Sequence, residues 1–220
     1  MRITAIVPMR HHSERVPGKN YRLLGNEPLF VHIVSALLSC DVIHEVAIDT
    51  DSSAVREIAS TRFPNVRIID RPAHLRSGST PMNDVLLNTV QFLEADAYLQ
   101  THSTNPFLSE DTLRRALTAF TESTCDSLFS VTERRTRFWT PDGKPVNHDP
   151  RRLLRTQDLD PLLEENSCIY IFTRKTIQET GNRIGQDPLI FPMDQMEALD
   201  IDTEADFQIA ECLHRVRSHE

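Results

Sequence analysis

The chain has 220 residues, 39% of them hydrophobic and 25% charged, a composition typical of one globular domain. Its formal net charge of −8 argues against nucleic acid as a partner, because duplex binding normally needs a broad basic surface. No apolar run approaches the roughly 20 residues that span a bilayer, and no secretory signal is visible, so we expect no membrane partner.

Short apolar, β-branched runs alternate with segments of helical periodicity along the chain. This alternation is typical of an α/β fold with a mostly parallel sheet flanked by helices. In chain order the sequence predicts strand Ile3–Val7, helix Pro28–Leu38, strand Val46–Asp49, helix Ser52–Thr61, strand Val66–Ile69, helix Asn83–Leu93, strand Ala97–Gln100, helix Asp111–Thr121, strand Ser127–Val131, strand Cys168–Phe172 and helix Glu204–Arg217.

Local signals mark where several helices begin. The helix from Pro28 is apolar nearly all round, so we expect it to be buried. Ser109 is an N-cap candidate, and Asp51 is expected to cap the helix that starts at Ser52. The run from Thr203 to Asp206 fits an acidic capping box.

The alternation breaks between about residues 132 and 166. Four prolines punctuate this polar stretch, and Asp142-Gly143 predicts a hairpin turn. So long a departure is usually a functional insertion, a lid or an arm that reaches a partner subunit. We therefore predict a single domain, 1–220, with 132–166 as an inserted arm.

The loop from Val7 to Asn20 is the most informative part of the sequence. It follows the first predicted strand, contains Pro and Gly, and carries Arg10, Arg15 and Lys19 on an otherwise acidic chain. Such loops at the carboxyl ends of strands are where open α/β sheets bind nucleotides, which indicates a small polyanion such as a nucleoside triphosphate. The alternative is a solvated basic turn. The loop is neither a Walker loop nor a dinucleotide-binding fingerprint.

A second pattern is Asp200-Ile201-Asp202. In extended backbone the two carboxylates point to the same face, while Ile201 turns to the core. Two such oxygen ligands beside phosphate oxygens suit Mg²⁺. The alternative is that Asp202 or Thr203 merely caps the following helix and Asp200 is solvated.

Other chemistries find little support. No pair of the nine histidines has a helical ligand spacing, so a zinc site is improbable. No serine lies in a nucleophile elbow, which argues against a hydrolase. The widely spaced cysteines are expected to be free thiols in a reducing cytoplasm; they are Cys40, Cys125, Cys168 and Cys212.

The order of residues in the loop resembles a known signature. Arg10-x-x-Ser13-x-Arg15-Val16-Pro17-Gly18-Lys19-Asn20 resembles the A-R-x-G-S-K-R-x-P-x-K-N of the acylneuraminate cytidylyltransferases, the CMP-sialic acid synthetases. Further segments match in the same order along the chain: Asp70-Arg71-Pro72; Leu99 to Phe107, similar to L-Q-P-T-S-P-L; Arg155 to Leu159, similar to R-R-Q-D-L; Glu165 to Phe172, similar to E-N-G-A-I-Y-I-F; and Leu199 to Phe207, similar to I-D-I-D-T-E-x-D-F.

The resemblance implies a Rossmann-like nucleotidyltransferase fold and transfer of CMP from CTP to a nine-carbon nonulosonic (sialic-type) acid, with release of pyrophosphate. It also implies a homodimer formed through the arm, and Mg²⁺ or Mn²⁺ as the cation. By the same resemblance, Arg10 and Lys19 contact the triphosphate, and Ser13 and Arg15 shape the loop. Asn20 and Arg71 approach the cytidine, and Asp200 and Asp202 hold the cation. The residues implied on the sugar side are His102, Arg155, Gln157 and Asn166.

Several positions depart from the family pattern. Glu14 replaces the usual Lys, and His11-His12 replace small residues, which alters the loop that approaches phosphate. His102 stands where the family often has a sugar-contacting Gln, and Asn105 replaces the usual Ser, so both hint at a different sugar acid. Three alternatives stay open: a nucleotidyltransferase for another sugar such as 3-deoxy-octulosonate, a glycosyltransferase that uses Asp200-x-Asp202, and a catalytically dead nucleotide-binding protein.

Overall fold

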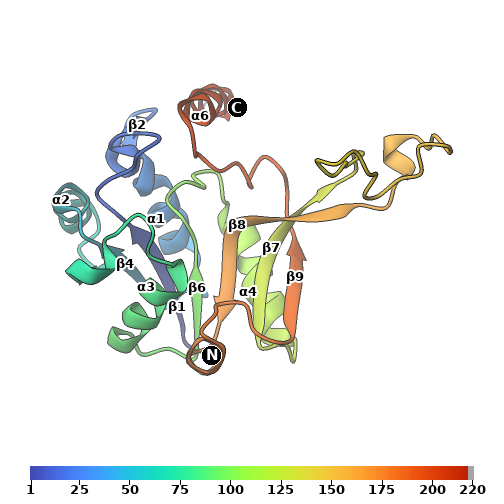
Figure 1. Ribbon diagram of the computed structural model, residues 1–220. Helices are drawn as coiled ribbons and strands as arrows, with labels where there is room; N and C mark the ends of the chain where they lie inside the picture. The colour runs from blue at the N-terminus through green and yellow to red at the C-terminus, as the bar shows by residue number, and fades with distance from the viewer. Residues whose placement is uncertain (218–220) are drawn as a thin grey trace.

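The computed structural model describes residues 1–217, which form a seven-stranded sheet with helices on both faces (Figure 1). The strand order is β5-β4-β1-β6-β8-β7-β9. The β1 strand pairs in parallel with β4 and β6, whereas β8 runs antiparallel to β6 and β7. The strands are β1 (Ile3–Met9), β4 (Glu45–Thr50), β5 (Arg67–Asp70), β6 (Ala97–Gln100), β7 (Ser127–Arg134), β8 (Leu162–Phe172) and β9 (Pro188–Pro192).

The helices pack in two layers around this sheet. One apolar cluster joins the sheet to α1, α2 and α4, and a second joins its other face to α3 and α5. A third, smaller cluster lies under α6, above the carboxyl ends of β1 and β6 (Figure 1). The helices are α1 (Leu29–Ser39), α2 (Ser53–Arg62), α3 (Met82–Thr89), α4 (Glu110–Glu122), α5 (Arg174–Thr180) and α6 (Glu204–Arg217). None of the helices within residues 1–217 combines the length and the apolarity that a bilayer crossing needs.

Every predicted strand and helix is present, and the mostly parallel α/β architecture is confirmed. The helix from Pro28 is buried along most of its length, as its composition predicts. The following elements were not predicted from the sequence: α5, β9 and the two-stranded ribbon of β2 (Leu23–Leu24) and β3 (Glu27–Pro28). The β9 strand begins and ends with proline and lies at the sheet edge, where a missing N–H is tolerated, so its sequence does not read as a strand.

Two predicted helix caps are confirmed. The Ser109 hydroxyl accepts a hydrogen bond from the Thr112 N–H at 3.2 Å. At the start of α6, an Asp206 carboxylate oxygen accepts from the Thr203 N–H at 2.7 Å, and the Thr203 hydroxyl accepts from the Asp206 N–H at 3.3 Å. This reciprocal capping box fixes the start of the helix directly after the Asp200-x-Asp202 segment.

The predicted cap at Asp51 is wrong. The N-cap of α2 is Ser52, whose hydroxyl accepts from the Val55 N–H at 3.3 Å. The Asp51 carboxylate instead accepts the backbone N–H of His11 at 2.8 Å. Both residue types are good caps, and a contact from a distant loop decides between them.

Residues 135–161 form an arm that projects from the body of the molecule between β7 and β8 (Figure 1). At its tip, the predicted turn is confirmed, since the Gly143 N–H donates to the Thr140 carbonyl at 2.9 Å. Gly143 has φ of +80°, a conformation that favours glycine. A short 3-10 turn, Thr156–Asp158, lies on the return path of the arm.

Candidate active site

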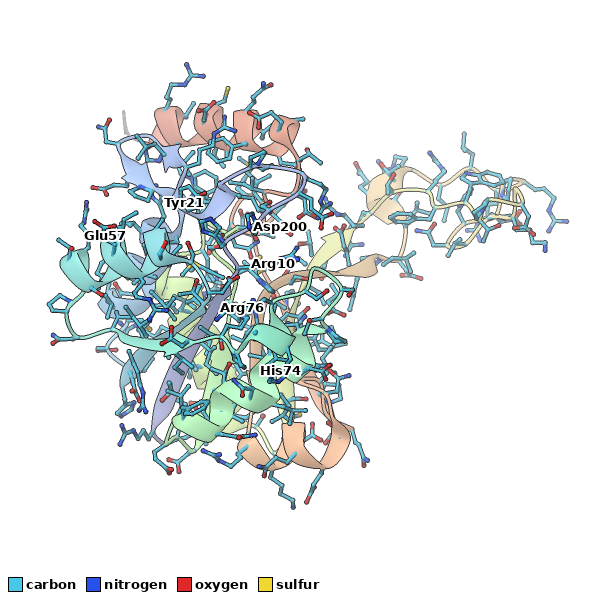
Figure 2. The ribbon with its side chains drawn as sticks, turned by 60° about the vertical axis from the view of Figure 1, so that its left-hand side comes forward. Arg10, Tyr21, Glu57, His74, Arg76 and Asp200 are labelled. Atoms are coloured by element: carbon cyan, nitrogen blue, oxygen red, sulfur yellow. The ribbon has the colours of Figure 1, made fainter. Side chains whose placement is uncertain are left out.

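A cavity of about 450 Å³ opens at the carboxyl end of β1. Its walls come from the loop after β1, the loop after β6 and the segment before α6, so they join the two ends of the chain. Figure 2 shows Arg10 and Asp200 close together at this place. The lining residues include Arg10, His12, Ser13, Glu14, Arg15, Lys19, Asn20, Gly78, His102, Ser103, Thr104, Ser167, Asp200 and Asp202.

The loop after β1 has its own internal architecture. Gly18 has φ of +67°, and a Cβ there would lie 2.9 Å from the Tyr21 ring, so glycine is needed. Asn20 is buried: its amide donates to the Arg10 carbonyl at 2.7 Å and its oxygen accepts from the Ser103 hydroxyl at 2.6 Å. Asn20 therefore ties the start of the loop to its end and to the loop after β6, and both of its polar atoms are already bonded to protein.

Arg15 and Lys19 converge on the segment before α6. An Arg15 nitrogen lies 2.8 Å from an Asp202 carboxylate oxygen, and the Lys19 ammonium lies 3.7 Å from the same oxygen. Lys19 also donates to the Ile201 carbonyl at 2.5 Å. Burial lowers the pKa of Lys19, and the charges of Asp202 and Asp200 partly offset this effect. The cationic loop and the two aspartates, separated by about 180 residues in the sequence, thus form one charged site.

Asp200 has a buried carboxylate oxygen, Oδ1, without a hydrogen-bond partner among residues 1–217. Burial raises the pKa of this carboxyl, while a hydrogen bond from Thr104 acts in the opposite direction. A buried oxygen without a donor fits a cation ligand. Within the described residues no group of three or more His, Cys, Asp or Glu side chains gathers to hold a metal, so an ion here would depend on ligand and water oxygens as well.

Arg10 and Glu14 both face the cavity. A Cβ placed on Gly78 would lie 2.9 Å from an Arg10 nitrogen and 3.0 Å from a Glu14 oxygen, so both side chains reach the same point. Within the described part of the chain, neither the guanidinium nor the carboxylate forms a hydrogen bond or an ion pair. The carboxylate that departs from the family pattern therefore lies in the site beside a free cation.

The rings of the two loop histidines, His11 and His12, contact each other edge to face, with their centroids 4.8 Å apart. His11 packs against Tyr21, with ring centroids 5.9 Å apart, and its Nδ1 lies 2.9 Å from the Ser52 hydroxyl. Because Asp51 accepts the His11 backbone N–H, that N–H is not available to a phosphate. His12 lines the cavity.

Arg71 is buried beside the first cavity. Its guanidinium lies 2.5 Å from an Asp49 oxygen, and the other Asp49 oxygen accepts from the Thr89 hydroxyl at 2.8 Å. Arg71 lines a smaller cavity of about 200 Å³, which shares Arg10 and Gly78 with the larger one. A flat, compact ligand group could enter this second space from the first.

The predicted sugar-side residues do not all meet. Arg155 and Gln157 are exposed on the arm, where Arg155 pairs with Asp158 at 2.7 Å, and neither lines the main cavity of its own chain. The Asn166 amide donates to Thr132 at 3.0 Å, and its oxygen accepts from Ser130 at 2.6 Å. Within one chain these three side chains do not meet, and their place on the sugar side stays a prediction. The Asn166 side-chain oxygen also accepts the Cys168 N–H at 3.2 Å, across Ser167, which has φ of +59°.

His102 does line the main cavity, and its Nε2 atom lies 3.0 Å from the Gln100 amide. Three residues were not predicted from the sequence: Gly78, which lines the cavity, and Gln100 and Arg183, which are joined to His102 by hydrogen bonds. Gln100 lies within a matched segment and could have been found there. Gly78 and Arg183 lie in loops without any recognisable pattern, so only the fold brings them to this place.

The profile of the family described as cytidylyltransferase matches residues 4–217. The chain is 28% identical over 226 residues to the CMP-N,N'-diacetyllegionaminic acid synthase of Legionella pneumophila, a match that covers 97% of this chain and 96% of that protein. It is 27% identical over 216 residues to the N-acylneuraminate cytidylyltransferase A of Danio rerio, covering 95% of this chain and 50% of that protein. The chain also superposes on the solved structure of CMP:2-keto-3-deoxy-manno-octonic acid synthetase complexed with CTP, with a TM-score of 0.75 at 15% identity. This match covers 99% of this chain and 100% of that one. This likeness confirms the Rossmann-like fold.

Proposed function

The chain belongs to the cytidylyltransferase family and is a nucleotidyltransferase, and we propose that it transfers CMP from CTP to a nonulosonic acid of the sialic type, with release of pyrophosphate. One observation carries the proposal. Arg10, Lys19 and Asp200 line one cavity at the carboxyl end of β1, although they come from opposite ends of the chain. The activities of the Legionella and Danio relatives support the sugar-acid part of it.

The arrangement suits an in-line displacement at the α-phosphorus by the anomeric hydroxyl of the sugar acid. Arg10, whose guanidinium has no protein partner within the described residues, and Lys19 stabilise the charge that develops on pyrophosphate. Asp200 and Asp202 would hold a divalent cation, which when bound supplies charge neutralisation at phosphate oxygens. The orphaned Asp200 oxygen is the feature of this chain that supports such an ion.

The two cavities, which share Arg10 and Gly78 among their lining residues, suggest how the nucleotide lies. We place the triphosphate in the larger cavity, between Arg10 and Lys19, and the cytosine in the smaller one beside Arg71. The sugar acid then lies toward His102 and Ser167 at the opposite wall. Asn20 acts by holding the loop, since both polar atoms of its side chain are bonded to protein.

The exposed arm supports a homodimer as part of the proposal. It carries exposed apolar side chains, including Trp139, Val146 and Leu153. Arg155 and Gln157 lie on the same arm, outside the cavity of their own chain. If they contact the sugar acid, they do so in the site of a second copy.

The test is pyrophosphate release with CTP, UTP or GTP across a panel of sialic-type acids and 3-deoxy-octulosonate. We expect release with CTP and at least one nine-carbon acid. Turnover with 3-deoxy-octulosonate alone would identify the enzyme for another sugar. Formation of free nucleotide from a nucleotide sugar, without pyrophosphate, would indicate a glycosyltransferase, and nucleotide binding in calorimetry without any release would indicate a dead enzyme. Each of these three results refutes the proposal.

A further inference from the structure

Three polar side chains form a hydrogen-bonded row behind the sugar side of the cavity. Arg183, in the loop after α5, donates to the side-chain oxygen of Gln100 at 2.5 Å. The Gln100 amide nitrogen lies 3.0 Å from His102 Nε2 and 3.1 Å from the Thr101 carbonyl. A guanidinium only donates, so Arg183 fixes which end of the Gln100 amide carries the oxygen. The amide hydrogens must then face His102.

This row determines the protonation state of His102. Its Nε2 atom accepts from Gln100, so the imidazole proton resides on Nδ1. Burial lowers the pKa of His102 to about 3, and the charges of Arg183 and Lys19 act in the same direction. Nδ1 bonds to no other atom of residues 1–217, and it is not among the buried unpartnered atoms, so it is open to the cavity. His102 thus presents a neutral N–H donor.

Arg183 is itself held firmly. Its guanidinium stacks on Tyr170, 3.5 Å from the ring centroid, and Tyr170 lies opposite Gln100 in the β6–β8 pairing. The Arg183 backbone N–H donates to the Asn83 side chain on α3 at 3.3 Å. Because both its guanidinium and its backbone are fixed, Arg183 determines the orientation of the Gln100 amide.

We propose that Arg183 and Gln100 are positioning residues that hold His102 as a neutral hydrogen-bond donor, through Nδ1–H, for an oxygen of the sugar acid. The sugar-acid part rests on the proposed function. A fixed neutral donor recognises a hydroxyl, carbonyl or carboxylate oxygen that lies along the direction of its N–H bond. It would reject an analogue that lacks this oxygen, because the bound analogue would cover the donor and leave it unpaired. This places a specificity determinant at a position where this chain departs from its family.

The first test measures the imidazole ¹⁵N shifts of His102 in the substrate-free protein, assigned with a His102→Gln variant. We expect the Nδ1–H tautomer in the wild type and a mixture of tautomers in Arg183→Met. Arg174→Met is the matched control, since Arg174 likewise contacts a buried tyrosine, Tyr98, but does not contact Gln100. Gln100→Glu offers His102 only an acceptor, so the Nε2–H tautomer or the imidazolium is expected there.

The second test is kinetic. In Arg183→Met the KM for the sugar acid should rise at least about tenfold, while the KM for CTP stays within about twofold. An unchanged tautomer in Arg183→Met, an Nε2–H tautomer in the wild type, or an equal rise of both KM values would overturn the inference. Absence of pyrophosphate release by the wild type with every sugar acid would instead refute the proposed function, and the tautomer comparison would still decide whether Arg183 positions His102.

Discussion

Glu14 offers the sharpest test of the triphosphate site, because it places a carboxylate where the family has a cation. Its side chain reaches the same point near Gly78 as the Arg10 guanidinium, within the cavity. A phosphate bound to Arg10 would therefore lie near the Glu14 charge. Replacing Glu14 by Lys reverses that charge without altering the core, since Glu14 is exposed.

The expected magnitude follows from Coulomb's law. One unit charge about 6 Å from one phosphate charge contributes about 0.7 kcal/mol at the dielectric constant of water and about 2.8 kcal/mol at an effective value of 20. Because Glu14 is exposed, the lower value applies. A two-unit change then amounts to about 1.4 kcal/mol, so Glu14→Lys should lower the Kd for CTP about tenfold, and Glu14→Gln about threefold.

Calorimetric titration with CTP, without sugar acid and at fixed Mg²⁺, measures this effect. Glu57→Lys is the matched control: Glu57 is an exposed glutamate on α2, away from Arg10 (Figure 2), and its replacement changes the net charge equally. Raising the salt concentration from 0.1 M to 1 M should reduce the increase in CTP affinity of Glu14→Lys, because the Debye length falls from about 10 Å to about 3 Å. If Glu14→Lys tightens CTP no more than Glu57→Lys does, Glu14 does not face the triphosphate.

Four further changes test other parts of the structure. Asp202→Asn should reduce turnover with CTP at least about 100-fold in the pyrophosphate assay, whereas near-normal turnover would remove Asp202 from the reaction. Arg71→Met leaves a buried carboxylate unpaired and should lower the free energy of unfolding by about 3–5 kcal/mol in urea titrations. Ser167→Val should lower the free energy of unfolding by about 1–3 kcal/mol in the same titrations, because β-branched residues avoid positive φ. Ser167→Gly should leave the free energy of unfolding nearly unchanged. Burial lowers the pKa of His32, so the fold favours its neutral form. This contribution to stability is complete above about pH 6.5 and is lost as the pH falls. Thermal melts should therefore show a smaller loss of stability between about pH 7 and pH 5 for His32→Gln than for the wild type.

The regular elements could be predicted because each has an unambiguous period. Residues 110–122 show the 3.6-residue repeat of a half-buried helix, and residues 97–100 form a short apolar run. The ends are harder, because two cap-forming residues often stand side by side. At Asp51 and Ser52, the choice depends on the backbone N–H of His11, about 40 positions away, and no local rule contains that contact.

The candidate site was predictable only where its residues lie in ordered motifs. Lys19 and Asp202 could be paired from the resemblance, and the structure brings them within 3.7 Å. Ser167 carried a readable signal as well, since it stands at the family's glycine and has φ of +59°. Arg183 carried none: it is one arginine in an irregular loop, and only the packing of that loop on Tyr170 gives it a role.

The charges of the site would link the binding of the proposed cation to that of the proposed triphosphate. Arg15 and Lys19 pair with Asp202, so the cations that would bind phosphate and a carboxylate that would bind a metal ion neutralise each other. A triphosphate that draws Arg15 and Lys19 away frees Asp202 for a divalent cation. By linkage, a cation on Asp202 frees Arg15 and Lys19 for phosphate to the same extent. These ion pairs would therefore favour joint binding of nucleotide and metal over binding of either one alone.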